Sequence, residues 1–163
     1  QRFSYRFDSC KLAGQSLPAV RFYLGMIPQI TDYLLRKLPD SFQGWTREAL
    51  EDYVLFHAEQ GTLKIATQDE QVVAVLVGWR QMGPEPKAWT WQASDHNGDH
   101  WYWHQFAADC AVFAMAVAAK FFHDRPESAI LPAIGHRNGK LVTYKKGSMP
   151  IYKMAYKKHG NIS

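Results

Sequence analysis

Cysteine is almost absent from this chain, since only Cys10 and Cys110 occur among its 163 residues. The two stand far apart in the sequence, and they form neither a CxxC pair nor a Cys/His spacing typical of zinc sites. We therefore expect reduced thiols in an intracellular protein, because disulfides are rare in that compartment. A bridge between Cys10 and Cys110 stays open as the alternative.

Long hydrophobic runs are also missing. The longest apolar stretch, residues 111–122, is shorter than the roughly 20 residues that a membrane-spanning helix needs. No signal-peptide layout, P-loop, GxSxG, HExxH or kinase signature is present. We therefore expect a soluble, cytoplasmic protein without a membrane partner, folded as a single domain over residues 1–163.

Acidic residues are scarce near the end of the chain, although the formal net charge of the whole chain is only +4. From Arg125 onward, Glu127 is the sole acidic residue among many lysines and arginines. The basic C-terminal segment, residues 140–163, is predicted to attract phosphate groups of a nucleic acid or of a phosphorylated cofactor. A solvated tail is the alternative interpretation.

Aromatic residues, by contrast, are abundant, and many of them flank Asn97 and Gly98. This dipeptide favours a type I′ turn, because both of its residues tolerate the positive φ that such a turn requires. We predict a hairpin over residues 88–106, in which Trp91 lies opposite His104. Both faces of this hairpin carry large aromatic side chains, so it is expected to be covered on both sides.

A helix is predicted directly after this hairpin. Residues 107–123 contain no glycine or proline, are rich in strong helix formers and are nearly apolar all round. A helix of this kind is typically buried, and its alanines would let a sheet approach closely.

Two more helices are predicted earlier in the chain. Apolar residues recur at helical spacing over residues 20–38, where Pro28 would kink or divide the helix. A second helix is predicted between Thr46, as its N-cap, and Gly61, which would stop it.

The remaining segments indicate strands. Residues 62–67 alternate in polarity and residues 72–80 are apolar on both faces, which predicts an outer strand followed by a central one. A second hairpin is predicted over residues 129–144, about Asn138 and Gly139. The order of elements predicts an α+β fold, in which helices pack on a mostly antiparallel central sheet.

Three residues are the leading candidates for chemistry. His104, on a central strand beside an aromatic ring, could be held in one tautomer and act as a general base for an amine. Tyr144 is a candidate general acid, and Cys110 could have a thiolate stabilised at the start of a helix. For each of them, a purely structural role in packing is the alternative.

A metal site is not predicted. Asp95, His96, Asp99 and His100 crowd the predicted turn. Turn chemistry alone explains Asp and Asn at a hairpin tip, and no third ligand is fixed by spacing.

The order of elements resembles the Gcn5-related N-acetyltransferase (GNAT) fold, in which two helices precede an antiparallel meander and a central helix follows its last strand. Residues 63–67, 72–80 and 101–106 would be those strands, residues 107–123 would be the helix, and the resemblance covers roughly residues 18–145. It implies transfer of an acyl group from acetyl-CoA, another acyl-CoA or an acyl carrier to the amine of a small molecule or protein.

The GNAT cofactor loop, Gln/Arg-x-x-Gly-x-Gly/Ala, is missing. It should lie near residues 105–112, which read Gln-Phe-Ala-Ala-Asp-Cys-Ala-Val and contain no glycine. The glycines normally let backbone N–H groups approach the pyrophosphate of coenzyme A, and Asp109 would place a negative charge there.

The resemblance nevertheless implies a place for the acyl donor. It would enter between residues 72–80 and 101–107, and the backbone near Phe106, Ala107 and Ala108 would hold its acyl arm. Cys110, at the start of the helix, belongs to the same implied cofactor site.

Residues 101–108, Trp-Tyr-Trp-His-Gln-Phe-Ala-Ala, are also similar to a strand of the toxin-activating lysine acyltransferases. Those GNAT-like enzymes use an acyl carrier protein and lack the glycine loop. In this alignment His104 replaces a catalytic Asp. The catalytic histidine of that family has no counterpart here, because residues 1–56 contain no histidine.

Two functions from other classes stay open. The lysine-rich segment with Tyr144, Tyr152 and Tyr156 interleaved is compatible with nucleic-acid binding. Alternatively, a GNAT-shaped protein without catalysis could serve in binding or assembly, with the aromatic hairpin as its contact surface.

Overall fold

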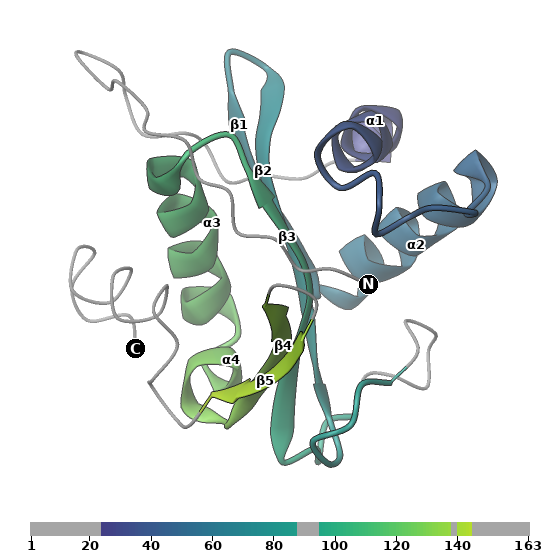
Figure 1. Ribbon diagram of the computed structural model, residues 1–163. Helices are drawn as coiled ribbons and strands as arrows, with labels where there is room; N and C mark the ends of the chain where they lie inside the picture. The colour runs from purple at the N-terminus through teal and green to yellow at the C-terminus, as the bar shows by residue number, and fades with distance from the viewer. Residues whose placement is uncertain (1–23, 88–94, 138–139, 145–163) are drawn as a thin grey trace.

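A five-stranded sheet separates two layers of helices in the computed structural model (Figure 1). The structure describes residues 24–87, 95–137 and 140–144. In chain order the elements are a 3-10 turn Leu24–Met26, α1 Ile27–Lys37, α2 Arg47–Gln60, β1 Leu63–Gln68, β2 Gln71–Gln81, β3 His100–Ala108, α3 Ala111–Asp124, α4 Glu127–Ile130, β4 Ala133–Arg137 and β5 Lys140–Tyr144.

The sheet has the order β1-β2-β3-β4-β5. Neighbouring strands are antiparallel except for β3 and β4, which are parallel and are connected through α3 and α4. This arrangement confirms the predicted α+β fold with a mostly antiparallel sheet. It also confirms that β1 is an outer strand and β2 an inner one.

Two hydrophobic cores lie on opposite faces of the sheet, one under α3 and the other under α1 and α2 (Figure 1). We call these the α3 face and the α1/α2 face. The α3 face includes Trp101, Trp103, Phe106, Phe113, Phe121 and Phe122. The α1/α2 face includes Ile30, Leu34, Leu50, Tyr53, Trp79 and Tyr102.

Glycine is required at position 78 for close packing on the α3 face. A Cβ atom there would lie 2.6 Å from Cε3 of Trp103 and 2.7 Å from Nε1 of Trp101. Gly78 of β2 therefore makes room for the two indole rings of the neighbouring strand.

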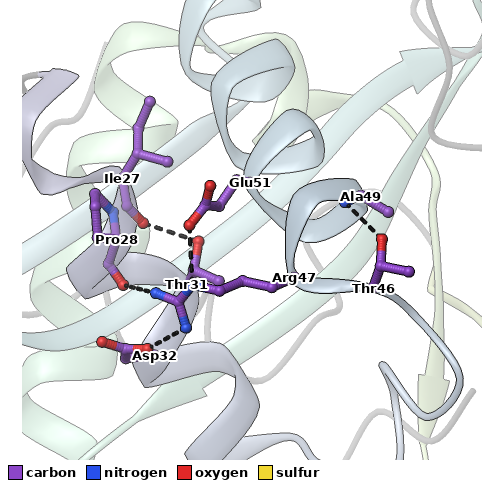
Figure 2. Close-up of polar contacts among 8 residues, drawn as sticks. All are labelled: Ile27, Pro28, Thr31, Asp32, Thr46, Arg47, Ala49 and Glu51. Carbon is purple, nitrogen blue, oxygen red and sulfur yellow. Dashed lines mark hydrogen bonds and ion pairs between the residues drawn. The ribbon is translucent and has the colours of Figure 1, made fainter.

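The residues predicted to begin and end α2 are confirmed. The hydroxyl of Thr46 accepts a hydrogen bond from the backbone N–H of Ala49 at 3.1 Å (Figure 2), and Gly61 ends the helix in the left-handed conformation. Of the two effects predicted for Pro28, the structure shows a division, because the 3-10 turn Leu24–Met26 ends and α1 begins just before it. Pro28 lies in the first turn of α1, where its missing N–H leaves no helical hydrogen bond unmade.

The predicted hairpin about Asn97 and Gly98 is also wrong in its pairing. The neighbours of β3 are β2 and β4, and Gly98 lacks the positive φ of a type I′ turn. Gly98 instead packs against the backbone of Gln81, where a Cβ atom would not fit. The proposed position of Trp91 opposite His104 lies outside the described residues.

Two element boundaries differ from those predicted. The strand β3 continues to Ala108, so α3 begins only at Ala111. The last predicted hairpin is confirmed as β4 and β5, but its first strand starts at Ala133 instead of residue 129. The short helix α4 occupies the preceding residues, because Pro126 starts a helical turn.

Within the described residues, no helix is both long and apolar enough to cross a membrane.

Candidate functional site

The parallel strands β3 and β4 begin side by side and then separate. Only three residue pairs join them, and the last of these is Trp103 with Gly135. Both strands run on, β3 to Ala108 and β4 to Arg137, without further pairing to each other. We call the place where they part the β3–β4 fork.

A β-bulge in β3 lies at this fork. Gln105 pairs with Val77 and Trp103 pairs with Gly78, so His104 is the extra residue between them. A bulge bends its strand and increases the local twist, which turns the end of β3 away from a neighbour. The fork and the bulge therefore coincide.

The acyl donor was expected between diverging ends of residues 72–80 and 101–107, but these strands do not diverge. β2 and β3 stay paired from Gln81 and His100 to Ala74 and Ala108. The strands that diverge are β3 and β4, whose parallel arrangement is not apparent from sequence spacing.

His104 is buried on the α1/α2 face. Its Nδ1 atom lies 2.7 Å from the hydroxyl of Tyr53, and its ring lies 5.0 Å from that of Trp79, between centroids. Burial lowers the pKa of His104 to about 3, so the imidazole is neutral at physiological pH. A neutral imidazole with so low a pKa is a weak base.

Tyr53 also keeps its proton. Complete burial raises the pKa of the Tyr53 hydroxyl well above its usual value. The Tyr53 hydroxyl and Nδ1 of His104 therefore form a hydrogen bond between two neutral groups, and the tautomer of the imidazole decides which of them donates.

His136 stands on the other arm of the fork. It directly follows Gly135, the last residue of β4 that pairs with β3, and its ring lies 6.2 Å from that of Tyr102. Side chains alternate along strands, and Tyr102 and Ile134 belong to the α1/α2 face, so His104 and His136 lie on that face too. His136 is only partly buried, and this burial lowers its pKa.

His57 of α2 extends this cluster. Its ring stacks on Trp79, with the centroids 4.9 Å apart, and its Nδ1 atom is 2.8 Å from the hydroxyl of Thr62. Burial lowers the pKa of His57 to about 3, and its Nε2 atom is buried without a hydrogen-bond partner. The histidines at the fork thus belong to a largely apolar, aromatic surrounding.

Phe106, Ala107 and Ala108 follow His104 in the part of β3 beyond the fork. Phe106 and Ala108 lie on the α3 face, whereas Ala107 lies on the α1/α2 face. Their role in holding an acyl arm stays a prediction, now with β4 as the facing strand.

Cys110 does not carry the reduced thiol that was expected, because it is disulfide-bonded. Its sulfur therefore cannot act as a thiolate. The other cysteine of the sequence, Cys10, lies outside the described residues. The expectation of a cytoplasmic location rested on reduced cysteines, and this disulfide disagrees with it, because disulfides are rare in the cytoplasm.

Tyr144 and His104 are not brought together. Tyr144 ends β5, pairs with Ala133 and packs against the core of the α3 face, whereas His104 is on the α1/α2 face. Tyr152 and Tyr156 lie outside the described residues.

Asp109 connects β3 to α3, and its charge is balanced. Its carboxylate lies 2.9 Å from the ammonium group of Lys37 and accepts a hydrogen bond from the hydroxyl of Tyr33 at 3.0 Å. The repulsion that Asp109 would exert on a phosphate at the start of α3 is therefore reduced.

The residues near the predicted turn form ordinary polar contacts. Asp99 lies 2.8 Å from Nδ1 of His100 and accepts the N–H of Gly83, while the carboxylate of Asp95 accepts the N–H of Asn97. Across the described ranges, no group of three or more His, Cys, Asp or Glu side chains could hold a metal ion.

Comparisons with known proteins give similarity at the level of structure alone. No protein-family model matches the sequence, and no curated protein matches it. Among solved structures, it is similar to the GNAT-like decarboxylase GphF in complex with isobutyryl-CoA, with 14% identity and a TM-score of 0.52. That match covers 72% of this chain and 64% of the decarboxylase, so this chain spans less than two thirds of that protein.

A second similar structure is described as histone acetyltransferase HPA2 and related acetyltransferase from Corynebacterium glutamicum. It has 15% identity and a TM-score of 0.43, and the match covers 74% of this chain and 76% of that one. The order of elements and the similarity to GphF together show that this protein has a divergent GNAT fold.

Proposed function

We propose that the protein binds an acyl thioester in the β3–β4 fork and transfers the acyl group to an amine of a small molecule or protein. The observation that carries this proposal is the fork itself, with His104 on one arm and His136 on the other, on one face of the sheet. The donor is acetyl-CoA, another acyl-CoA or an acyl carrier, which share the same reactive thioester.

Two features support a donor at this place. Diverging strands leave room for an extended arm whose amides can pair with strand backbone, as peptides do in β-augmentation. The start of α3 follows directly after β3, and the positive end of a helix dipole attracts phosphate groups. The solved GphF complex, which contains isobutyryl-CoA, agrees with this class of ligand.

His136 is the better general base of the two histidines. It is partly exposed, so it can exchange protons with solvent, and its lowered pKa keeps it unprotonated at neutral pH. It would remove a proton from the attacking amine as the nitrogen bonds to the thioester carbon. The tetrahedral intermediate then collapses, the C–S bond breaks, and the leaving thiolate takes up a proton.

His104 has a different role in this scheme. Because it is neutral, we assign it as a hydrogen-bond donor toward the thioester oxygen, with Tyr53 donating to Nδ1 and the ring proton on Nε2. Negative charge develops on that oxygen in the transition state, and fixed donors in a water-poor site stabilise it effectively.

A titration with thioesters tests the proposal. The melting temperature should rise with acetyl-CoA or isobutyryl-CoA, and mass spectrometry should detect acyl transfer to an added amine. A small thioester without the nucleotide, acetyl-N-acetylcysteamine, distinguishes recognition of the thioester from recognition of the phosphates. No thermal shift with any thioester at millimolar concentration, and no transfer, would contradict the proposal.

Decarboxylation is a second candidate function. The observation that favours it is the hydrogen bond between His104 and Tyr53, two buried groups that are both neutral at physiological pH. Loss of CO2 from a β-carboxyacyl thioester leaves an enolate, which needs donors and then a proton but no amine or base. Release of CO2 in the absence of any amine would identify this reaction.

Two other functions were considered from the sequence, nucleic-acid binding and a contact surface for assembly. Nucleic-acid binding by residues 140–163 stays a prediction, because the structure describes only Lys140–Tyr144 of that segment. Trp101, Tyr102 and Trp103 of the predicted aromatic hairpin are buried and so cannot form an exposed contact surface, while Trp89 and Trp91 lie outside the described residues.

A further inference from the structure

A cavity of about 320 Å³ lies between α1 and the start of β2. Its lining residues are Gln29, Asp32, Tyr33 and Arg36 from α1 and Gln71 and Val72 from β2. The volume is at the lower end of the range for small-molecule sites. Val72 is about 20 Å along β2 from Gly78 at the base of the β3–β4 fork, at ~3.3 Å per residue. The cavity lies nearer to the far end of β3, because the hydroxyl of Tyr33 donates to the carboxylate of Asp109 at 3.0 Å.

Arg36 supplies a positive group at this cavity. Its guanidinium lies over the ring of Tyr33, 5.4 Å from the centroid, and no ion pair engages it among the residues that the structure describes. A guanidinium with its donors available is suited to a carboxylate, which it can bind through two parallel hydrogen bonds.

Asp32 supplies the opposite charge on the same helix. Its Oδ1 atom pairs with Nη1 of Arg47 at 2.7 Å, as Figure 2 shows, and this pair ties α1 to α2. The pair engages one carboxylate oxygen. The other oxygen is an acceptor for a second cation.

Gln29 adds an acceptor that lacks a donor. Its side-chain nitrogen donates to the backbone oxygen of Glu70 at 3.2 Å, which fixes the amide. Its Oε1 atom is buried and has no hydrogen-bond partner. A buried acceptor without a partner typically costs about 1–3 kcal/mol, so a bound N–H donor would be favourable here.

We propose that this cavity binds a small zwitterion, an α-amino acid or a compound with the same two charged groups. The carboxylate would bind to Arg36, the ammonium group would lie between Asp32 and Oε1 of Gln29, and the ligand's side chain would contact Tyr33 and Val72. A simple anion fits less well, because Asp32 would repel it and Gln29 would stay unpaired. This site is additional to the proposed acyl transfer and does not depend on it.

Saturation-transfer NMR with each proteinogenic L-amino acid at millimolar concentration tests the proposal on the wild-type protein. For each binder, the N-acetyl form and the carboxamide form each remove one charge. Each should bind about tenfold more weakly or worse, since one charge-assisted hydrogen bond is worth about 1.5–3 kcal/mol. If no amino acid binds, or if both blocked forms bind as well as the parent, the proposal is wrong.

Two variants locate the site. Arg36→Gln should abolish binding and Asp32→Asn should weaken it, while Lys140→Gln, which removes an exposed charge on the distant β5, should leave it unchanged. Both test residues are exposed, so the variants should keep the wild-type melting temperature within a few degrees. Binding that survives Arg36→Gln would overturn the proposal. A second result would also overturn it: inorganic phosphate competes with the amino acid and binds equally well to the Asp32→Asn variant and to the wild-type protein. That result would identify the cavity as a site for anions.

Discussion

His104 of β3 and His136 of β4 are the first residues beyond the paired part of two parallel strands, and both lie on the α1/α2 face. Burial is the main cause of the lowered pKa of His104, and His57 and then His136 add to it. The partly exposed His136 and the buried His104 can therefore divide the work of base and donor.

Replacement of His136 by glutamine should lower the rate of acyl transfer without weakening donor binding. The expected loss in kcat is about 10²–10⁴-fold, the usual contribution of a general base. Single-turnover kinetics with acetyl-CoA and an amine would measure it. His123→Gln is the matched control, because His123 is exposed at the end of α3, and a similar loss in both variants would contradict the role of His136.

Tyr53→Phe should change the tautomer of His104. The hydroxyl that lies 2.7 Å from Nδ1 is lost, so a buried ring nitrogen loses this hydrogen bond at a cost of about 1–3 kcal/mol in unfolding free energy. NMR shifts of the ring nitrogens would report the tautomer, and urea unfolding the stability. Tyr102→Phe serves as the control on β3. If the His104 nitrogen shifts are the same in wild type and Tyr53→Phe, Tyr53 does not set the tautomer.

The protein should lose stability as the pH falls from about 6.5 toward 3. His57 and His104 have a pKa of about 3 in the folded state, against about 6.5 in an unfolded chain. Between these values the unfolded state binds more protons, so the unfolding free energy decreases by up to about 1.4 kcal/mol per pH unit for each histidine. Urea unfolding at several pH values would measure this slope.

His57→Phe provides the control for that slope. It removes one titrating group, so the dependence of unfolding free energy on pH should become shallower, whatever its effect on stability at neutral pH. An unchanged slope would mean that His57 is not held neutral in the folded state.

Gly78→Ala should destabilise the sheet. The added methyl group would overlap the rings of Trp101 and Trp103 and approach the backbone oxygen of Tyr102 to 2.9 Å. Overpacking of this kind typically costs about 1–3 kcal/mol, which calorimetry would detect as a lower melting temperature. Gly135→Ala is the matched control, because its nearest contacts are at 3.7 Å, and equal effects would contradict the packing argument.

Asp109→Asn should strengthen the binding of acyl-CoA. The carboxylate at the start of α3 is balanced by Lys37, and its removal would leave that ammonium group available to a phosphate. Lys37→Met should have the opposite effect. Calorimetric titration should show both changes with acetyl-CoA and neither with acetyl-N-acetylcysteamine. Equal changes with both ligands would mean that phosphates do not bind near Asp109.

Most elements of the fold could be predicted from local patterns. The apolar residues 72–80, the cap at Thr46 and the alanine-rich residues of α3 each indicate their element directly. The hairpin at Asn97 was predicted wrongly, because a turn signal reports only local preference. The long β2 strand competes as a partner for β3 and pairs with it over nearly its whole length.

The candidate site was predictable only in part. His104 stood out on a central strand, but His136 was missed because its relation to His104 depends on the parallel register of β3 and β4. No pattern within a single segment reports such a register. The disulfide at Cys110 was only the alternative to a reduced thiol, since two cysteines distant in sequence carry no pairing signal.

The extra residue at position 104 also bears on how this strand can change. Trp101 and Trp103 face α3 before the bulge, and Phe106 and Ala108 face α3 after it. The residues that face α3 therefore have odd numbers before the bulge and even numbers after it. A chain shortened by that one residue would place the same apolar side chains on the same sides. Packing on the α3 face therefore does not depend on the residue at position 104, which the bulge turns toward Tyr53 and Trp79 on the other face.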